Sequence, residues 1–275
     1  MAMNVADAHS GKVSVPGGEL VYDVLGHGTP LVLIHAAIAD RKMWDREMLS
    51  YPRRYRVVRY DLRGYGDSRA ATEPYSNADD LRALLDELGF DSVDLIGASM
   101  GGLVALDFAL QHPTRARRVV AVGSGLGLFE PGDDARVKEA FLSLDLVFAK
   151  VTTAWKAGNL DEVVERLLET FGPGLMESSR SQIAAMIRRN AEEIATDRSS
   201  SHATGRLTRE RLSGIRTPTL VVTGTRDHPA LRWSSHQLVA ALLNARCLDL
   251  IGGDHFPMFS RTSEFDAAVF EFLSR

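Results

Sequence analysis

The chain has 275 residues and a net charge of −4, because 36 acidic residues outnumber 32 lysines and arginines. The hydrophobic share of 45% and the charged share of 25% are ordinary for a globular protein. The acidic balance and the lack of a basic block argue against a nucleic-acid-binding protein. No run approaches the roughly 18 apolar residues that span a bilayer, so we expect neither a nucleic-acid nor a membrane partner.

The amino terminus and the single cysteine bear on the location of the protein. Residues 1–12 are small and polar and contain no apolar run like that of a signal peptide, so a cytoplasmic location is expected. Cys247 cannot form an internal disulfide, and its apolar surroundings predict a buried, inert thiol.

In chain order, the first half alternates short apolar strands with amphipathic helices. Two strands around the turn at 16–18 predict a hairpin, and the continuous apolar run at 31–34 is typical of a strand covered on both faces. The predicted elements are strands at 12–15, 19–25, 31–34, 56–60, 93–96 and 118–122, with helices at 76–88 and 99–111.

The second half is interrupted by a helical insertion. Residues 125–206 show helical periodicity without a strand signal, in helices predicted at 133–156, 160–170 and 175–196, and the serine-rich stretch 197–205 is the expected hinge back. Strands at 219–222 and 246–251 and helices at 231–243 and 263–273 follow. This order predicts a mostly parallel eight-stranded sheet flanked by helices, with a core of 1–124 and 207–275 and a helical cap of 125–206.

The strongest chemical signal is the sequence Gly-Ala-Ser-Met-Gly at 97–101. It follows the strand at 93–96 and opens the next helix, which is the strand–turn–helix context of a nucleophile elbow. A serine hydroxyl is a weak nucleophile that must be held near a base. A tight turn presents Ser99 to a cleft, and the glycines on either side leave room for that turn. We therefore predict that Ser99 is a catalytic nucleophile.

With this motif the sequence resembles the α/β-hydrolase superfamily over nearly the whole chain except the insertion. The resemblance implies an α/β-hydrolase sheet with an inserted helical cap and a triad in the order serine, acid, histidine. Asp227, in the loop after the strand at 219–222, matches the acid, and His255, in the glycine-rich loop after 246–251, matches the base. Asp254 is interpreted as a turn former.

The loop after the strand at 31–34 matches the family's oxyanion loop. Ala36 stands where the family usually has glycine. The resemblance implies that the backbone N–H groups of Ala37 and Met100 hold the oxyanion, with Ala36 as the alternative to Ala37. His35 and the loop 61–68 are expected to be structural.

The resemblance implies a serine hydrolase that cleaves a carboxylic ester, thioester or lactone of a small to medium apolar substrate, without cofactor or metal, as a monomer or homodimer. Carbon–carbon bond hydrolysis, perhydrolysis and a role as a ligand receptor are the alternatives. Some apolar side chains of the insertion should line the pocket. Its arginines are expected on a solvated face: Arg136, Arg166, Arg180, Arg188 and Arg189.

Overall fold

A computed structural model describes residues 9–196, 204–205 and 207–275. The strands are β1 (His9–Val15), β2 (Gly18–Leu25), β3 (Thr29–Ile34), β4 (Tyr55–Tyr60), β5 (Val93–Ala98), β6 (Ala116–Val122), β7 (Thr219–Gly224) and β8 (Ala245–Leu250). The α-helices are α1 (Asp45–Ser50), α2 (Asn77–Glu87), α3 (Met100–Gln111), α4 (Ala135–Lys156), α5 (Leu160–Phe171), α6 (Glu177–Arg189), α7 (Ala191–Thr196), α8 (Pro229–Ala241), α9 (Pro257–Ser260) and α10 (Thr262–Leu273).

The eight strands form one mostly parallel sheet, as the sequence predicts. The strand order is β1-β2-β4-β3-β5-β6-β7-β8. Only β1 with β2 and β2 with β4 pair antiparallel, whereas β3, β5, β6, β7 and β8 run parallel to one another. The carboxyl ends of these central strands therefore open at the same edge of the sheet, where open α/β sheets bind their ligands.

Both faces of the sheet are covered by helices, which explains the continuous apolar strands. In β3, Leu31 and Leu33 pack into one buried cluster and Val32 and Ile34 into the other, and all four side chains are fully buried. Helices α1, α9 and α10 contribute to the first cluster, and α2 and α3 to the second. A strand buried on both faces has no polar positions to alternate with its apolar ones.

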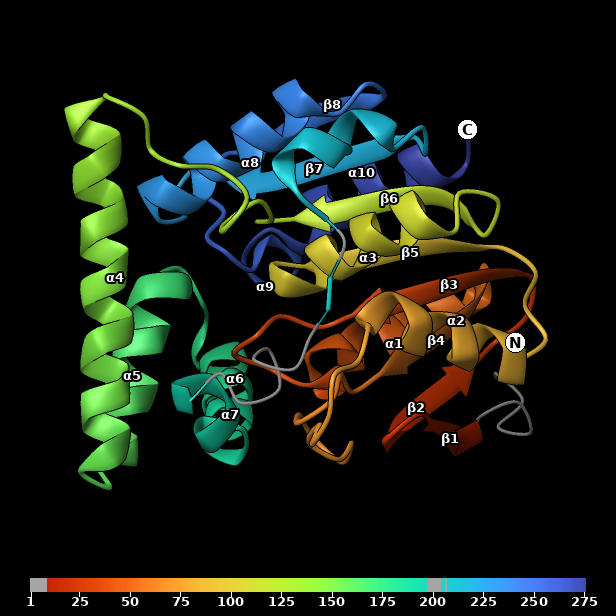
Figure 1. Cartoon of the computed structure of the whole chain (residues 1–275), viewed down its shortest axis with the longest axis horizontal. Coiled ribbons are helices and arrows are strands. Elements are labelled where there is room, and N and C mark those ends of the chain that lie inside the picture. Colours follow the sequence, from red (N-terminus) through yellow and green to blue (C-terminus); the bar gives the residue numbers. More distant parts are fainter. Residues whose placement is uncertain (1–8, 197–203, 206) are drawn as a thin grey trace.

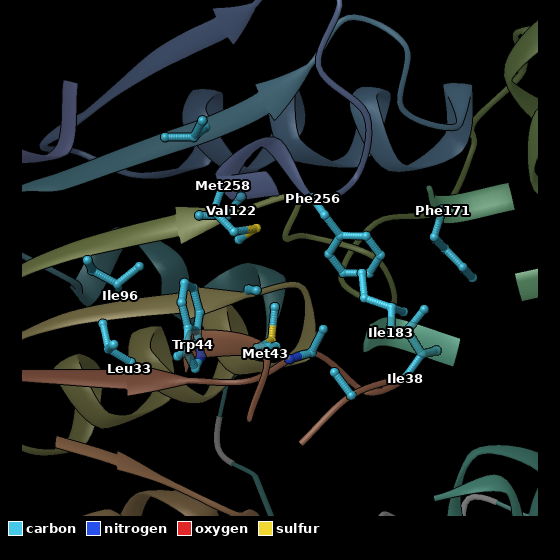
Figure 2. Packing of buried hydrophobic residues seen from close by; sticks show 14 of the residues in the cluster. Leu33, Ile38, Met43, Trp44, Ile96, Val122, Phe171, Ile183, Phe256 and Met258 are labelled. Atoms are coloured by element: carbon cyan, nitrogen blue, oxygen red, sulfur yellow. Dashed lines mark hydrogen bonds between the residues drawn. The ribbon is translucent and has the colours of Figure 1, made fainter. Parts of the chain in front are cut away.

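Helices α4 to α7 lie together beyond the ends of the central strands (Figure 1). We call them the helical segment. Its apolar side chains continue the core: Phe171 and Ile183 belong to the same buried cluster as Ile38 and Phe256 of the sheet loops (Figure 2). The helical segment is thus packed onto the core by buried apolar contacts. The hinge predicted at 197–205 falls largely outside the described residues.

The helix predicted at 175–196 is in fact two helices, α6 and α7, which meet at Asn190. The Asn190 side chain donates from Nδ2 to the carbonyl oxygen of Met186, four residues back, at 2.8 Å. Asparagine side chains that bond the local backbone in this way compete with regular helix and favour helix ends. The periodicity of apolar residues continues across Asn190, so the sequence pattern does not reveal the break between the two helices.

Short helical elements were not predicted at all. They are α1, α9 and the 3₁₀ helices η2 (Arg41–Trp44), η3 (Tyr51–Arg53) and η5 (Arg209–Gly214). Each has six residues or fewer, which is too short to show a helical period of apolar residues.

The expectation of a buried Cys247 is wrong. Its thiol is exposed, because β8 is the last strand of the sheet and leaves that face open. Partial desolvation and the neighbouring Asp249 carboxylate raise the pKa of the thiol to about 11, so it remains protonated at neutral pH. In the described part of the chain, no helix combines the length and apolar character needed to cross a membrane.

Candidate active site

Ser99 lies between β5 and α3 in a strained backbone conformation. Its φ of 51° is the only positive φ of a non-glycine residue in the described chain. The conformation is held by hydrogen bonds, because the Ser99 N–H donates to Val122 at 2.6 Å and the Ser99 carbonyl accepts from the Ser124 hydroxyl at 2.9 Å. Such strain persists only where the surroundings enforce it, and it is concentrated at functional sites.

The two glycines of the elbow are required by close backbone contacts. A Cβ on Gly97 would collide with the backbone of Gly101, and a Cβ on Gly101 would collide with the backbone of Ile34 in β3. Glycine alone permits this approach of the helix start to the neighbouring strands. Helix α3 begins at Met100, directly after Ser99, so the electropositive start of the helix lies beside that residue.

Asp227 and His255 meet at the ends of β7 and β8. The His255 Nδ1 lies 2.8 Å from Asp227 Oδ2, and both side chains are buried, at 3% and 0% exposure. The other Asp227 oxygen, Oδ1, accepts from the backbone N–H of His228 at 2.6 Å. The two loops also bond each other, as Arg226 N donates to the Gly253 carbonyl at 2.8 Å. The carboxylate thus has one oxygen fixed by the backbone and one facing the imidazole.

Ser99 and His255 line the same cavity, which has a volume of about 430 Å³. Its walls are largely apolar, with Leu126 from the chain after β6, Leu231 from α8, and Phe148 and Phe171 from the helical segment. Among the described residues no hydrogen bond joins the Ser99 hydroxyl to the imidazole. Such bonds are often long without substrate and tighten in the complex.

The loop after β3 brings Ala36 and Ala37 to the cavity beside Ser99. The Ala36 N–H already donates to the Met43 sulfur at 3.3 Å, and Ala36 is almost completely buried. Met100, the first residue of α3, also lines the cavity. The N–H of Ala36 is therefore engaged elsewhere, whereas Ala37 and Met100 line the cavity together with Ser99.

The buried His35 side chain holds this loop through hydrogen bonds to the backbone. The backbone N–H of Leu62 donates to His35 Nε2 at 2.9 Å, so Nδ1 carries the proton and donates to the Ala36 carbonyl at 2.9 Å. Complete burial lowers the pKa of the imidazole, which keeps it neutral. His35 is structural, as expected, and links the loop after β3 to the loop 61–68.

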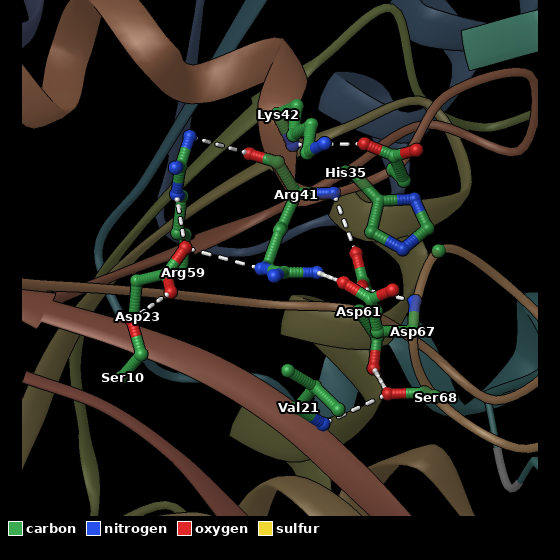
Figure 3. A network of polar contacts seen from close by, with 12 residues as sticks. Ser10, Val21, Asp23, His35, Arg41, Lys42, Arg59, Asp61, Asp67 and Ser68 are labelled. Carbon is green, nitrogen blue, oxygen red and sulfur yellow. Dashed lines mark hydrogen bonds and ion pairs between the residues drawn. The ribbon is translucent and has the colours of Figure 1, made fainter.

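The charged side chains of the loop 61–68 hold the loop in place through hydrogen bonds and ion pairs. The Asp61 carboxylate is fully buried and accepts from the Arg41 guanidinium, the Arg41 backbone N–H and the Asp67 N–H (Figure 3). Ser68 donates to the Asp61 carbonyl at 2.8 Å and accepts from Val21 N at 2.9 Å. These bonds fix the shape of the loop, in agreement with the interpretation of its charges as scaffold.

The histidine loop is anchored to the helical segment. The His255 N–H donates to the carbonyl of Phe171, the last residue of α5, at 3.1 Å, and the two rings lie 5.1 Å apart. Asp254 accepts from Phe256 N at 2.9 Å and from Gly174 N at 3.2 Å. Burial raises the pKa of Asp254 despite these bonds. Asp254 is a turn former, as predicted, and it also reaches the helical segment.

Comparison with known proteins agrees with this geometry. The profile of the alpha/beta hydrolase fold family matches residues 29–262. This chain belongs to the α/β-hydrolase fold family. A structure with the same fold is the enol-lactonase from Burkholderia xenovorans LB400, with a TM-score of 0.78 and 23% identity over 96% of this chain and 100% of that one.

Curated relatives of this α/β-hydrolase include two that match over most of their length. The pimeloyl-[acyl-carrier protein] methyl ester esterase of Aeromonas hydrophila is 28% identical over 90% of this chain and 96% of its own. The 3-oxoadipate enol-lactonase 1 of Acinetobacter baylyi is 25% identical over 86% of this chain and 85% of its own length. Other curated relatives are matched over part of their length only, 57% in one case and 36% in another.

Two residues of this α/β-hydrolase site escaped prediction. Gly123 follows β6 with a φ of 59°, and a Cβ there would lie 2.7 Å from His255 Cε1. Its contact with the imidazole is made across the sheet, so only its position after a strand could have signalled it. Glu193 of α7 lines the cavity and is buried at 5% exposure. Its sequence context, an amphipathic helix with other acids, is that of a surface residue.

A metal site was not expected in this α/β-hydrolase. In the described ranges one group of possible ligands, His236, Cys247 and Asp249, brings its donor atoms within 4.8 Å of one another, and all three residues are exposed. Asp249 already pairs with His236 at 3.0 Å, and the Arg232 guanidinium lies 3.9 Å from it. The positive charge of Arg232 opposes a cation there, and the group lies outside the cavity.

Proposed function

We propose that this protein is a serine hydrolase that cleaves a carboxylic ester, thioester or lactone through an acyl-enzyme. Ser99 is the nucleophile, His255 the general base and then acid, and Asp227 the residue that orients His255. The proposal rests mainly on one observation: the strained serine and the Asp227-bonded histidine line one largely apolar cavity.

In the first step the Ser99 oxygen attacks the substrate carbonyl while Nε2 of His255 accepts the hydroxyl proton. The backbone N–H groups of Ala37 and Met100 stabilise the oxyanion of the tetrahedral intermediate. His255 then donates the proton to the leaving alcohol, thiol or ring oxygen, and the bond to that group breaks. Asp227 keeps the proton on Nδ1, so Nε2 is free to accept.

In the second step water attacks the acyl-enzyme and loses its proton to Nε2. Collapse of the second tetrahedral intermediate returns that proton to Ser99 and releases the carboxylic acid. None of these steps requires a cofactor. The engagement of the Ala36 N–H by Met43 supports Ala37 as the oxyanion donor of the loop.

The cavity supports a small to medium apolar acyl or alcohol group as the preferred substrate. A volume of about 430 Å³ lies in the lower part of the range of small-molecule sites. Phe148 of α4 and Phe171 of α5 close it from the side of the helical segment. Long acyl chains would have to leave the cavity and lose apolar contact.

Hydrolysis of a panel of p-nitrophenyl esters of increasing chain length, together with simple lactones, tests this proposal. We expect kcat/KM to rise from acetate to a medium chain and to fall for palmitate. Turnover of ring-fission dienones without any turnover of esters or lactones would instead favour carbon–carbon hydrolysis. Saturable ligand binding with no turnover at all would favour a receptor.

The contact between Gly123 and the histidine makes a separate prediction. An alanine Cβ at this position would press on the imidazole at 2.7–2.8 Å, which is closer than carbon atoms approach without displacement. A misplacement of a catalytic group by about 1 Å costs about 10²-fold, so Gly123→Ala should lower kcat for the best ester about 100-fold.

Gly132→Ala is the matched control for this variant. Gly132 has nearly the same φ, 61° against 59°, and an added Cβ there would have no other group within 4 Å. It therefore carries the same backbone strain without the contact. Equal kcat values for the two variants would contradict a specific role of Gly123 in seating His255.

A further inference from the structure

Asn190 joins the helical segment to two loops of the core. It lies at the junction of α6 and α7 and is buried at 4% exposure. Its Nδ2 donates to the Met186 carbonyl at 2.8 Å and to Asp40 Oδ2 at 3.2 Å, and its Oδ1 accepts from the Gly66 N–H at 2.8 Å. Both ends of the amide are thus used. Only a side chain that is donor and acceptor at once can make this set of bonds.

The partners of Asn190 belong to rigid parts of the core. Asp40 is fully buried, and its other oxygen accepts from the Lys42 N–H at 3.0 Å at the start of η2. Gly66 adopts a φ of 56° beside the buried Asp61 carboxylate. A buried amide between two such fixed groups has little freedom to move, because each lost bond would leave a polar group buried and unpaired.

Each partner lies a few residues from a wall of the cavity. Asp40 is three residues after Ala37, and Gly66 follows Tyr65, and both Ala37 and Tyr65 line the cavity. Helix α7 begins directly after Asn190 and contributes Ile194 to the same cavity. The amide therefore ties together the oxyanion loop, the loop 61–68 and the helical wall that faces them.

A charged pair reinforces the junction. Arg189, the last residue of α6, pairs with Asp67 and lies 3.9 Å from Asp40 Oδ2. Arg189 is exposed, in agreement with the expectation of a solvated face for the arginines of the insertion, and its guanidinium also bridges to the core. Asp67 also accepts from Arg41 at 2.8 Å, so the pair continues into the network of Figure 3.

We propose that Asn190 is a positioning residue that sets the oxyanion loop against the cavity wall through its hydrogen bond to Asp40. This inference rests on the proposed hydrolase function for its effect on turnover, but the junction itself can be measured without activity. Loss of the bond should shift Ala37 relative to Ser99 and loosen α7. Because the oxyanion forms only in the transition state, kcat should fall more than KM rises.

An exchange of the two side chains tests the bond directly. Asn190→Asp places two carboxylates in contact in a buried site. In Asp40→Asn the Lys42 N–H holds the new amide oxygen, so that two NH₂ groups face each other. In the double variant Asp40→Asn with Asn190→Asp, one donor and one acceptor face each other again, and residue 190 still accepts from Gly66. Met186 retains the bond from the backbone N–H of residue 190, which is 3.0 Å long.

We expect each single variant to lower kcat about tenfold or more, with KM within about threefold of wild type. The double variant should recover kcat to within about threefold, a coupling that a double-mutant cycle quantifies. Asn159→Asp is the matched control, because Asn159 caps α5 on the exposed side of the helical segment and aspartate caps equally well. It should leave kcat unchanged.

Amide hydrogen exchange of residues 36–40 and 191–196 provides the readout that is independent of activity. Faster exchange of both segments in each single variant, with recovery in the double variant, supports the proposed role of Asn190 at the junction. This result would stand even if the protein turned over no ester or lactone, and only the proposed hydrolase function would then fail. The proposal is overturned if the two substitutions act independently. In that case the loss of kcat in the double variant equals the product of the losses in the single variants, and its amide exchange does not slow toward that of wild type. Thermal unfolding of every variant identifies those that fail to fold.

Discussion

Replacing Ser99 with alanine is expected to lower kcat for the best p-nitrophenyl ester on the order of 10⁵-fold. The hydroxyl is the group proposed to form the acyl-enzyme, and loss of a serine nucleophile from a triad removes nearly all the catalysis that the triad provides. The remaining rate would reflect the oxyanion donors and the cavity acting on water alone.

The fold of Ser99→Ala should persist. Alanine at a φ of 51° meets the same backbone strain as serine, and the bonds that hold this turn are made by backbone groups and by Ser124, not by the Ser99 hydroxyl. Initial rates and the stoichiometry of labelling by a fluorophosphonate measure the effect, and Ser181→Ala, an exposed serine of α6, serves as the control. Turnover within tenfold of wild type would remove Ser99 from the mechanism.

Asp227→Asn is expected to lower kcat about 10⁴-fold, the effect of the equivalent change in serine proteases. The structure explains why the amide would be harmful rather than neutral. The N–H of His228 points at Oδ1, so the asparagine oxygen would take that place and the NH₂ group would face His255. The imidazole would then have to accept at Nδ1 and carry its proton on Nε2, where it cannot accept a proton from Ser99.

The pattern of kinetic effects distinguishes this explanation from general damage. KM should change little, because Asp227 is separated from substrate by the imidazole, and the melting temperature should remain close to that of wild type. Asp249→Asn, an exposed aspartate of β8, is the control. A loss of less than tenfold in Asp227→Asn would mean that another group orients His255.

Much of the fold follows from local patterns in the sequence. The eight strands are recognisable because each central strand is buried on both faces and therefore reads as an apolar run, as in β3 and β5. The nucleophile turn is equally local, since all its requirements lie within Gly97–Gly101. Elements without such a signature, such as α1 and the break at Asn190, were not predicted.

The side chains proposed for catalysis were found by combining residue type and position after a strand with the order of the triad that the resemblance to the α/β-hydrolase superfamily implies. Asp227 and His255 follow the ends of β7 and β8, and parallel neighbouring strands bring their following loops together. Their contact could be expected without coordinates for that reason. The preference for Ala37 over Ala36 as the proposed oxyanion donor required the position of the Met43 sulfur, which depends on how η2 packs.

The amino-acid sequence by itself determined the class of fold and the strand–turn–helix motif around Ser99, because both depend on short local patterns. It also pointed to Asp227 and His255 as the proposed partners of Ser99, through their positions after strands and the resemblance to the α/β-hydrolase superfamily. Only the tertiary structure decided which side chains close the cavity and which contacts hold its walls in place. The bonds from Asn190 to Gly66 and Asp40 join residues that are 124 and 150 positions apart, and the close approach that leaves no room for a Cβ on Gly123 beside His255 is made across the sheet. Such contacts arise from the packing of separate elements, and no periodicity or motif within either partner encodes them.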